Sequence, residues 1–546
     1  MSEAENGAAM RNGGDKPLDV VVVGAGFAGV YAVYRYRRKN LSVLGFEGGS
    51  DVGGTWYHNR YPGARCDVRR IDYSYSFSPD LHQEWRWTET YAAQPEILRY
   101  IQHVAERYDL RRDIVFNTRI VAARWNEDAR LWRVTTDAGK RVACRFVVLA
   151  TGALSAPKIP DFPGLADFRG ARYQTARWPH DLIDFTGKRV GIFGTGSSGV
   201  QCIPVIAEHA THLTVFQRTP PFSTPARNGP MDEKGYAAVR ARYEDYRADV
   251  KAGWSGQISA SLSDVPGPAA TYTKAEQRDR FERAWATGGL APVSIFSDVI
   301  TNQESNDIIT EFIREKIRQI VKDPETAERL CPYDHPVVAR RPCIDTNYYE
   351  TYNRDNVTLV DVRTDPVDRI RPDGIQTRNG FHPVDAIVFA TGFDAFTGQV
   401  AKMDIRNAAG ERLIDYWKDG ARSYIGMSVT GFPNLFLVTG PGSPSVLANV
   451  ILAGEHDVDW IGDCIAWLGE HHHSRIEATA QAEADWVQHV AEIGAGTLYP
   501  KANSWYMGAN IAGKPRVFLP FVGGFGNFAN TCAAIAREGY RGFSID

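Results

Sequence analysis

The 546-residue sequence predicts an α/β protein with two nucleotide-binding units and a helical insertion. A short β-branched strand runs into a glycine-rich turn and a helix at residues 19–47, and the same order recurs at 188–217. Between residues 220 and 332 the pattern changes to charged segments with helical spacing. A chain of this length is too long for one hydrophobic core, so we expect more than one domain.

The first unit has the features of a dinucleotide-binding βαβ element. The strand at 19–23 enters the turn GAGFAG, and the strand that follows the helix ends at Glu47. The helix N-terminus offers free N–H groups to a phosphate, and Glu47 accepts hydrogen bonds from ribose hydroxyls. The turn uses glycine for a tight bend, for close approach to a pyrophosphate and for packing of helix on strand, at Gly24, Gly26 and Gly29 in that order.

The second unit differs at the end of its second strand. In the place of Glu47 it has Gln217, followed by Arg218 and Thr219. A carboxylate that repels a ribose 2′-phosphate is therefore absent, and a guanidinium that binds one is present. We assign FAD to the first unit and NADPH to the second. The candidate NADPH-binding residues are Gly194, Thr195, Gly196, Ser197, Ser198, Gly199, Arg218 and Thr219.

Domain boundaries follow from two later strands that both end in Ala-Thr-Gly, at 150–152 and 390–392. We interpret these ends as the points where the chain passes between two Rossmann-like dinucleotide-binding domains. The predicted division is a disordered tail over 1–16, an FAD-binding domain over 17–153 and 386–546, an NADP-binding domain over 154–219 and 333–385, and a helical insertion over 220–332.

Composition limits the class of function. The net charge of −3 provides no broad positive field for nucleic acid or an anionic membrane, so we expect a small-molecule substrate and a monomer. No segment reaches the roughly 20 apolar residues of a membrane span, and the N-terminus lacks a secretory signal. The seven cysteines form no CxxC pair, which indicates free thiols in a reducing cytoplasm and argues against a disulfide reductase. The adjacent histidines 471–473 cannot converge on one ion, so no metal site is expected.

Beyond these units, many segments of the chain resemble the FAD-containing Baeyer–Villiger monooxygenases. The matching segments run from near the start of the chain almost to its end, and among them are DVGGTWYHNRYPGARCD from residue 51, ATGALSAPKIPDFPGL from residue 150 and SWYMGANIAGKPRVF from residue 504. The resemblance implies FAD and NADPH as cofactors and a ketone and O2 as substrates. It implies conversion of the ketone to an ester or lactone through a C4a-peroxyflavin, with sulfoxidation as a further activity.

The resemblance also assigns site residues. Arg341 is implied as the catalytic cation that stabilises the peroxy anion, and Asp67 as the carboxylate that orients it. Arg340 is implied to help Arg218 hold the 2′-phosphate, and Trp505 to lie near the nicotinamide nucleotide. The further candidate cofactor contacts are Gly54, Thr55, Trp56, Asp67, Tyr73 and Gln201.

Two features depart from the family pattern. The family fingerprint FxGxxxHxxxWP falls on residues 168–179 with Gln174 in place of histidine. Glutamine forms hydrogen bonds but cannot be protonated, so we expect altered NADPH handling, with an uncoupled NADPH oxidase as an alternative. The pair Arg69 and Arg70 stands where relatives carry acidic or small polar residues, so these cations either compete for Asp67 or favour an anionic substrate.

Two other classes of function stay open. A flavin-dependent heteroatom oxygenase uses the same nucleotide units to oxidise amines or sulfides. The end of the fingerprint, Trp178 and Pro179, and Arg341 favour a ketone substrate instead. A flavin- or nucleotide-binding protein without turnover would explain Gln174, but the presence of both Arg341 and Asp67 argues against it.

Overall fold

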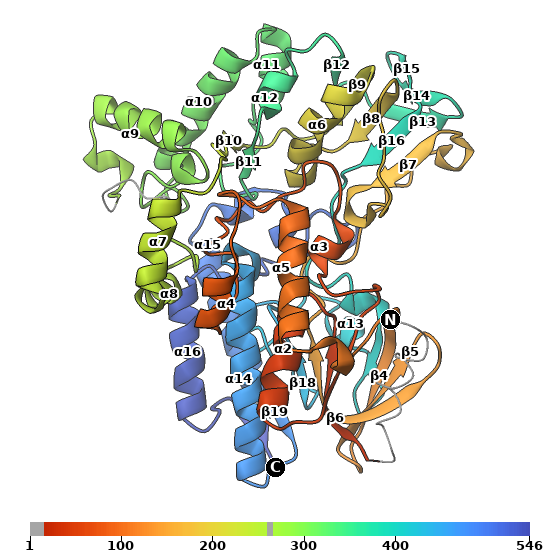
Figure 1. Ribbon diagram of the computed structural model, residues 1–546, viewed down its shortest axis with the longest axis vertical. Helices are drawn as coiled ribbons and strands as arrows, with labels where there is room; N and C mark the ends of the chain where they lie inside the picture. Colours follow the sequence, from red (N-terminus) through yellow and green to blue (C-terminus); the bar gives the residue numbers. More distant parts are fainter. Residues whose placement is uncertain (1–15, 259–265) are drawn as a thin grey trace.

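The computed structural model describes residues 16–258 and 266–546. Two sheets lie at opposite ends of the long axis, each with helices packed beside it (Figure 1). The predicted α/β class with two dinucleotide-type units and a helical region is therefore confirmed. The tail predicted over 1–16 lies, apart from Lys16, outside the described residues.

The first sheet has eight strands in the order β17-β4-β5-β6-β1-β2-β3, with β18 beside β6. β1 (Leu18–Val23) lies in parallel between β2 (Val43–Phe46) and β6 (Arg141–Leu149). Alternate valines of β1 enter hydrophobic cores on the two faces of the sheet, as expected for a strand covered on both sides. Helices α2 (Phe27–Arg38) and α14 (Val450–Glu470) pack together on one face. The other strands are β3 (Ile114–Val115), β4 (Ile120–Asn126), β5 (Leu131–Thr136), β17 (Asp404–Arg406) and β18 (Leu435–Leu437).

The second sheet has five parallel strands in the order β12-β9-β8-β16-β7. Helix α6 (Ser197–His209) follows the second glycine turn, as α2 follows the first. The repeated strand, turn and helix in the sequence thus produce two units with the same local geometry. The strands are β7 (Ala171–Gln174), β8 (Arg189–Phe193), β9 (His212–Gln217), β12 (Val357–Asp361) and β16 (Ala386–Phe389).

The point where the chain returns from the second domain to the first lies one strand later than the sequence suggested. β16 pairs with β7 and β8, so the chain stays with the second sheet beyond the boundary predicted at residue 386. After β16, residues 390–396 run beside residues 153–158, and the Lys158 N–H donates to the Gly392 carbonyl at 2.9 Å. The sequence could not distinguish the two sheets, because a short buried strand ending in Ala-Thr-Gly fits either one.

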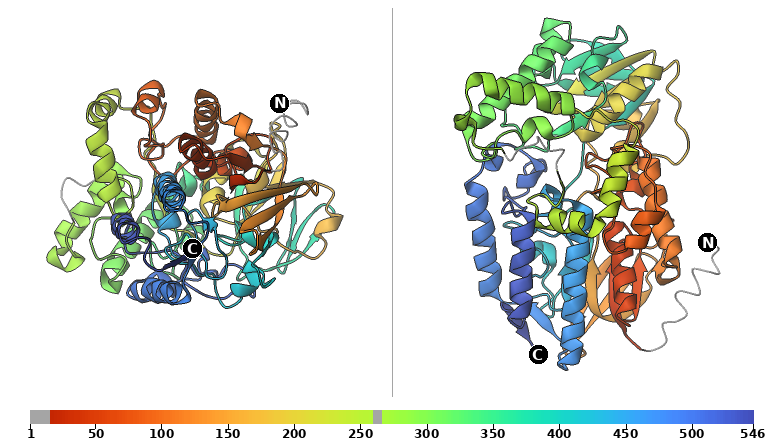
Figure 2. Two further views of the ribbon diagram at one scale, coloured as in Figure 1. Left: turned by 90° about the horizontal axis from the view of Figure 1, so that it is seen from below. Right: turned by 60° about the vertical axis from the view of Figure 1, so that its left-hand side comes forward.

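The segment over 220–332 is mainly helical. α9, α10 and α11 lie beside the second domain, whereas α7 and α8 reach the first domain (Figure 2). In α8, Arg247 donates to the Ser74 hydroxyl at 2.8 Å and Tyr246 to the Asp72 carboxylate at 2.6 Å. The insertion therefore contacts both domains. Its helices are α7 (Glu233–Ala241), α8 (Tyr243–Ala252), α9 (Lys274–Thr287), α10 (Gln303–Ile320) and α11 (Pro324–Leu330).

Shorter elements complete the two domains. No described helix combines the length and the apolar character needed to cross a membrane. The remaining helices are α3 (Thr55–His58), α4 (Pro79–Glu84), α5 (Gln94–Arg107), α12 (Tyr348–Thr351), α13 (Leu413–Tyr416), α15 (Ala480–Ala495) and α16 (Phe525–Arg537). The remaining strands form small sheets: β10 (Ser223–Pro225) with β11 (Cys343–Asp345), β13 (Val367–Arg371) with β14 (Gly374–Thr377) and β15 (Phe381–Pro383), and β19 (Ile476–Ala478) with β20 (Phe543–Ile545).

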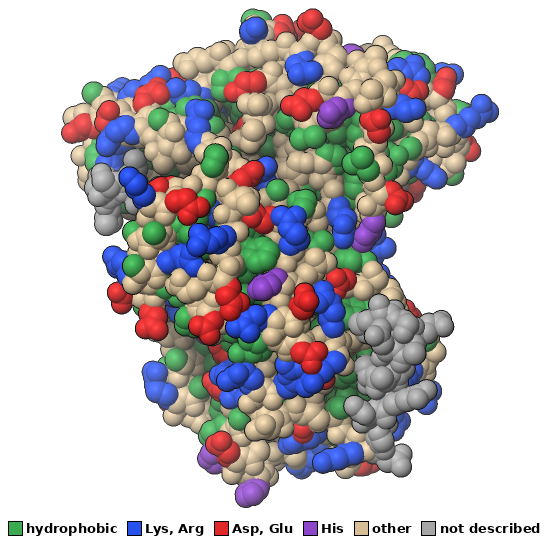
Figure 3. Space-filling view, in the orientation of Figure 1, with side chains coloured by type: hydrophobic (Ala, Val, Ile, Leu, Met, Phe, Trp, Pro, Cys, Tyr) green, Lys and Arg blue, Asp and Glu red, His purple; other side chains and the backbone are tan. Residues whose placement is uncertain are grey.

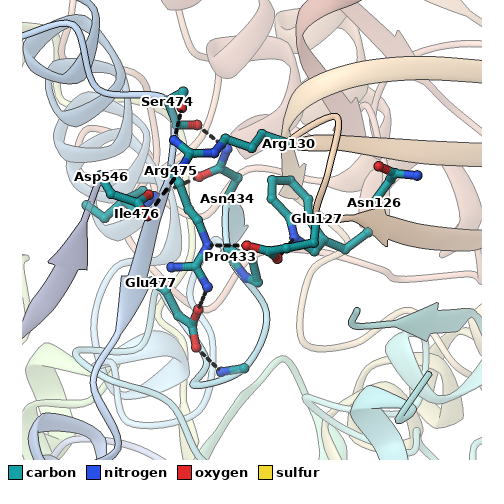
Figure 4. A network of polar contacts seen from close by, with 12 residues as sticks. Asn126, Glu127, Arg130, Pro433, Asn434, Ser474, Arg475, Ile476, Glu477 and Asp546 are labelled. Atoms are coloured by element: carbon teal, nitrogen blue, oxygen red, sulfur yellow. Dashed lines mark hydrogen bonds and ion pairs between the residues drawn. The ribbon is translucent and has the colours of Figure 1, made fainter. Parts of the chain in front are cut away.

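A network of charged side chains ties the C-terminal residues to the first sheet (Figure 4). Arg475, just before β19, pairs with Glu127 in the turn after β4 at 3.2 Å and with Glu477 in β19. Asp546 pairs with Arg130 at 3.5 Å. These contacts join the β19–β20 pair to the β4–β5 hairpin across more than half of the chain.

Replacing Arg475 with methionine is expected to lower the free energy of unfolding by about 1–3 kcal/mol, because Glu477 loses its charged partner while its side chain is only 16% exposed. Thermal unfolding monitored by circular dichroism measures the change. The matched control is Arg541→Met, which should be nearly neutral because Arg541 and Glu538 are 64% and 50% exposed. Equal losses in the two variants would contradict the special role of Arg475.

Candidate functional site

A cavity of about 400 Å³ lies where the two nucleotide units face each other. Its walls come from the first glycine turn, the segment around α3, the N-terminal part of α6 and residues near the C-terminus. The space-filling view shows the surface hollowed between the two domains (Figure 3). The predicted site residues that line the cavity are Gly24, Gly26, Glu47, Gly54, Thr55, Trp56, Asp67, Tyr73, Ser197, Ser198, Gln201, Arg341 and Trp505.

Both glycine turns have the same backbone geometry. Gly24 has a φ of +104° and Gly194 a φ of +103°, which side-chain-bearing residues rarely adopt. A Cβ atom would lie 2.6 Å from the Ala150 carbonyl oxygen at Gly24 and 2.4 Å from the Ala390 carbonyl oxygen at Gly194. The two Ala-Thr-Gly segments are therefore the neighbours that require glycine in the turns. A Cβ on Gly29 would collide with the Gly24 carbonyl, and a Cβ on Gly199 would collide with the Gly194 carbonyl.

Glu47 holds the first turn in place and faces the cavity. Its carboxylate accepts hydrogen bonds from the Ala25 N–H at 2.8 Å and the Gly49 N–H at 2.7 Å. Across the cavity, the Trp56 indole donates to the Tyr73 hydroxyl at 2.9 Å. The first unit thus presents a fixed carboxylate at the end of β2 and an aromatic wall, which suits recognition of a ribose and an adjoining ring system.

Arg341 and Asp67 form a bidentate ion pair in the cavity. Arg341 precedes β11 and Asp67 lies in the loop after α3, yet the guanidinium donates to the carboxylate at 2.7 and 2.8 Å. A third N–H of Arg341 donates to the Val446 carbonyl at 3.1 Å. Burial alone would lower the pKa of Arg341, but the charge and hydrogen bonds of Asp67 raise it above its usual value. The site therefore contains a permanent cation in a fixed orientation.

Tyr506 lies against this ion pair and is a residue that sequence reasoning missed. It is buried, and burial raises the pKa of its hydroxyl to about 12, so it stays neutral near pH 7. Its ring lies 4.4 Å from that of Trp505, which also contacts Phe396 at 5.8 Å. Its position next to Trp505 in the segment SWYMG was the available signal.

The second unit carries a group of cations after β9. Burial and the charge of Arg218 both lower the pKa of Arg340, and the same two causes lower the pKa of Lys158. The Thr195 hydroxyl donates to the Thr219 carbonyl at 3.0 Å and so joins the glycine turn to this segment. Arg218 and Arg340 are thus brought together. Lys158 was not predicted, because it comes from the linker between the domains.

Gln174 contacts that linker and does not line the cavity. Its side-chain amide donates to the Lys158 carbonyl at 3.2 Å, and the Thr391 hydroxyl donates to the same oxygen at 2.7 Å. The residue in the fingerprint position therefore joins β7 to the first linker, at a carbonyl oxygen that Thr391 of the second linker also contacts. A neutral amide is sufficient for this hydrogen bond.

Gln201 of α6 makes a second contact between the domains. Its amide accepts from the Tyr61 hydroxyl at 2.9 Å and donates to the Arg65 carbonyl at 3.0 Å. This contact places the segment that carries Asp67 directly against the second nucleotide unit.

Arg69 and Arg70 lie outside the main cavity. Both residues line a separate cavity of about 120 Å³ beside α7, and the Arg70 guanidinium contacts the Met231 sulfur. Burial lowers the pKa of Arg70 to about 10. Each Asp67 oxygen accepts a hydrogen bond from Arg341, whereas neither Arg69 nor Arg70 is among the residues that line the main cavity.

Comparisons with known proteins extend over nearly the whole chain. Residues 18–239 match the family described as pyridine nucleotide-disulphide oxidoreductase. A Baeyer-Villiger monooxygenase of Pseudooceanicola batsensis is 43% identical, covering 96% of this chain and 95% of that protein. A phenazine N-monooxygenase of Lysobacter antibioticus is 39% identical, covering 97% of this chain and 97% of that protein. The solved structure of OTEMO in complex with FAD and NADP gives a TM-score of 0.93 at 41% identity, covering 97% of this chain and 100% of that chain.

A double-mutant cycle can measure how far the ion pair contributes to stability. Asp67→Ala should destabilise the protein by about 1–3 kcal/mol, because it leaves the Arg341 guanidinium unpaired. The cost stays below that of a fully buried pair, since the two side chains are 20% and 27% exposed in the cavity. The double variant Asp67→Ala/Arg341→Met should lose less than the sum of the single variants in thermal unfolding. Strictly additive losses would mean that the pair does not contribute as a unit.

Proposed function

The chain belongs to the Baeyer–Villiger monooxygenases, and we propose that it uses NADPH and O2 to convert a ketone to an ester or lactone. One oxygen atom is inserted between the carbonyl carbon and its neighbour, and the other leaves as water with the two electrons from NADPH and two protons. The observation that carries the proposal is the cation Arg341, held by Asp67 in the cavity between two nucleotide units.

The described residues fit FAD in the first unit and NADP in the second. FAD, when bound, accepts hydride from NADPH and supplies the activated oxygen. Arg340 supports the NADP assignment because its Nε is buried without a hydrogen-bond partner within the described structure, as expected for a group that binds an anion. We assign FAD contacts to Gly24, Gly26, Gly29, Glu47, Gly54, Thr55, Trp56, Asp67 and Tyr73. We assign NADP contacts to Gly194, Thr195, Gly196, Ser197, Ser198, Gly199, Gln201, Arg218, Thr219, Arg340 and Trp505.

Arg341 provides the electrostatic part of the mechanism. Negative charge develops on oxygen while the oxygen atom is transferred to the carbonyl carbon, and a fixed guanidinium stabilises that charge. Asp67 keeps the guanidinium charged and oriented through two hydrogen bonds, and the Val446 carbonyl accepts a third. No side chain has to move or change protonation to provide this stabilisation.

The domain assignment follows the sheets. We place the FAD-binding domain in residues 17–153 and in the chain after β16, and the NADP-binding domain around the five-stranded sheet. We also infer a monomer that uses O2 as its oxidant in the cytoplasm. Seven buried free thiols support a reducing compartment.

A heteroatom oxygenase is the second candidate, because a phenazine N-monooxygenase is among the similar proteins. Product analysis distinguishes the two functions. The purified protein with NADPH and O2 is incubated with aryl, cyclic and linear ketones, a thioether and an aromatic N-heterocycle. An ester or lactone formed with consumption of NADPH supports the proposal. N-oxide or sulfoxide without any ester or lactone overturns it.

Arg341→Ala should leave reduction of FAD by NADPH close to the wild-type rate and lower ester formation by at least about 100-fold, because the cation acts only on charge that develops after O2 has reacted. Anaerobic stopped-flow absorbance measures the reduction step, and chromatography measures the ester. An ester yield near that of the wild type would show that Arg341 has a different role.

Gln174→His should lower the amount of hydrogen peroxide released for each NADPH consumed. A protonated imidazole can donate a charge-assisted hydrogen bond to the Lys158 carbonyl, which is stronger than the amide bond at 3.2 Å. Gln174→Asn is the control, because its shorter amide should lose the contact and release more peroxide. If peroxide release were unchanged in both variants, the hydrogen bond from residue 174 to the Lys158 carbonyl would have no role in coupling NADPH use to product formation.

A further inference from the structure

Unpaired cations from both nucleotide units lie together around the cavity. Arg119, between β3 and β4, lines the cavity from the first domain. Arg177 lines it from the second domain as the last residue of the 3-10 helix η3 (Thr175–Arg177), directly after β7. Within residues 16–258 and 266–546, neither arginine forms an ion pair with a carboxylate.

The two guanidinium groups lie close enough to repel each other. Burial and the charge of Arg119 lower the pKa of Arg177. Burial and the neighbouring charges, chiefly those of Arg177 and Arg119, lower the pKa of His58 to about 4. Arg119 and Arg177 therefore add two positive charges to the part of the cavity wall that also contains Glu47, and neither guanidinium is tied to a carboxylate by an ion pair. Such groups are suited to bind an anionic ligand.

The position of Arg119 indicates which ligand this is. Its guanidinium carbon lies 2.9 Å from the position of a Cβ built on Gly48, next to the carboxylate of Glu47 at the end of β2. Glu47 occupies the ribose-binding position of the first unit. The anionic group nearest to that ribose in FAD is the diphosphate, so Arg119 lies on the side of the cavity that would hold the adenosine diphosphate half of the cofactor.

Arg177 is held beside this site by a contact between the domains. The Trp178 N–H, one residue after Arg177, donates to the His58 carbonyl at 3.1 Å. The Tyr57 ring lies 4.9 Å from the ring of His180. The fingerprint segment of the second domain is thus docked on α3 of the first.

We propose that Arg177, together with Arg119, binds the adenosine diphosphate half of FAD, so that the second nucleotide domain supplies part of the binding site for the cofactor of the first. This inference rests on the proposed function, which places FAD in the first unit. It makes retention of FAD depend on how the fingerprint segment is docked.

The test compares Arg177→Ala with the matched control Arg172→Ala in the full-length protein. Arg172 is an exposed arginine in β7 that donates to the Leu165 carbonyl and does not line the cavity. After removal of bound flavin, titration with FAD is followed by flavin fluorescence at two salt concentrations. Arg177→Ala should raise the Kd for FAD about tenfold and reduce its dependence on salt. Arg172→Ala should match the wild type.

Two further measurements identify the group that is recognised. Arg177→Lys should recover most of the affinity, because it keeps the charge and shows that the loss is not caused by misfolding. ADP should compete with FAD less effectively in Arg177→Ala, whereas FMN binding should change less than FAD binding, because FMN has only one of the two phosphates and no adenosine. Equal Kd values and salt dependence in the alanine variants, or unchanged competition by ADP, would overturn the proposal. Failure of the wild type to bind FAD would instead overturn the proposed function itself.

Discussion

The bidentate contact between Arg341 and Asp67 joins two parts of the chain that are 274 residues apart. Asp67 belongs to the loop after α3, which the first domain positions, and Arg341 precedes β11, which packs beside the second. Forming this ion pair therefore requires both domains to be folded and docked. The ion pair is thus one of several contacts that hold the two nucleotide units against each other.

Several neutral hydrogen bonds support the same arrangement. Gln201 connects α6 to the segment that carries Asp67, and Gln174 connects β7 to the Lys158 carbonyl in the linker. None of these contacts depends on a proton that is exchanged near pH 7. These two contacts are therefore insensitive to pH in this range, and the charge at the Arg341 end of the cavity is provided by an arginine with a raised pKa.

The cavity itself has two electrostatic regions. At one end Arg341 is neutralised by Asp67, which leaves a local and oriented cation for chemistry on oxygen. Arg119 and Arg177, which also line the cavity, form no ion pair with a carboxylate in the described residues, which suits the binding of a phosphate-containing group. Arg69 and Arg70, although close to Asp67 in sequence, belong to neither region because the chain turns them toward α7.

The two glycine turns and the strands and helices around them could be predicted from the sequence alone. These features are local, because each turn needs a backbone conformation that side-chain-bearing residues rarely adopt, with a φ of +104° at Gly24 and +103° at Gly194. Folding was needed to place β16 in the second sheet and to turn Arg70 toward α7. It also brings Lys158 close to Arg218, Tyr506 close to Arg341 and Arg177 into the cavity wall. The reason is that these placements depend on contacts between residues far apart in the chain, which local patterns of hydrophobicity and spacing do not encode.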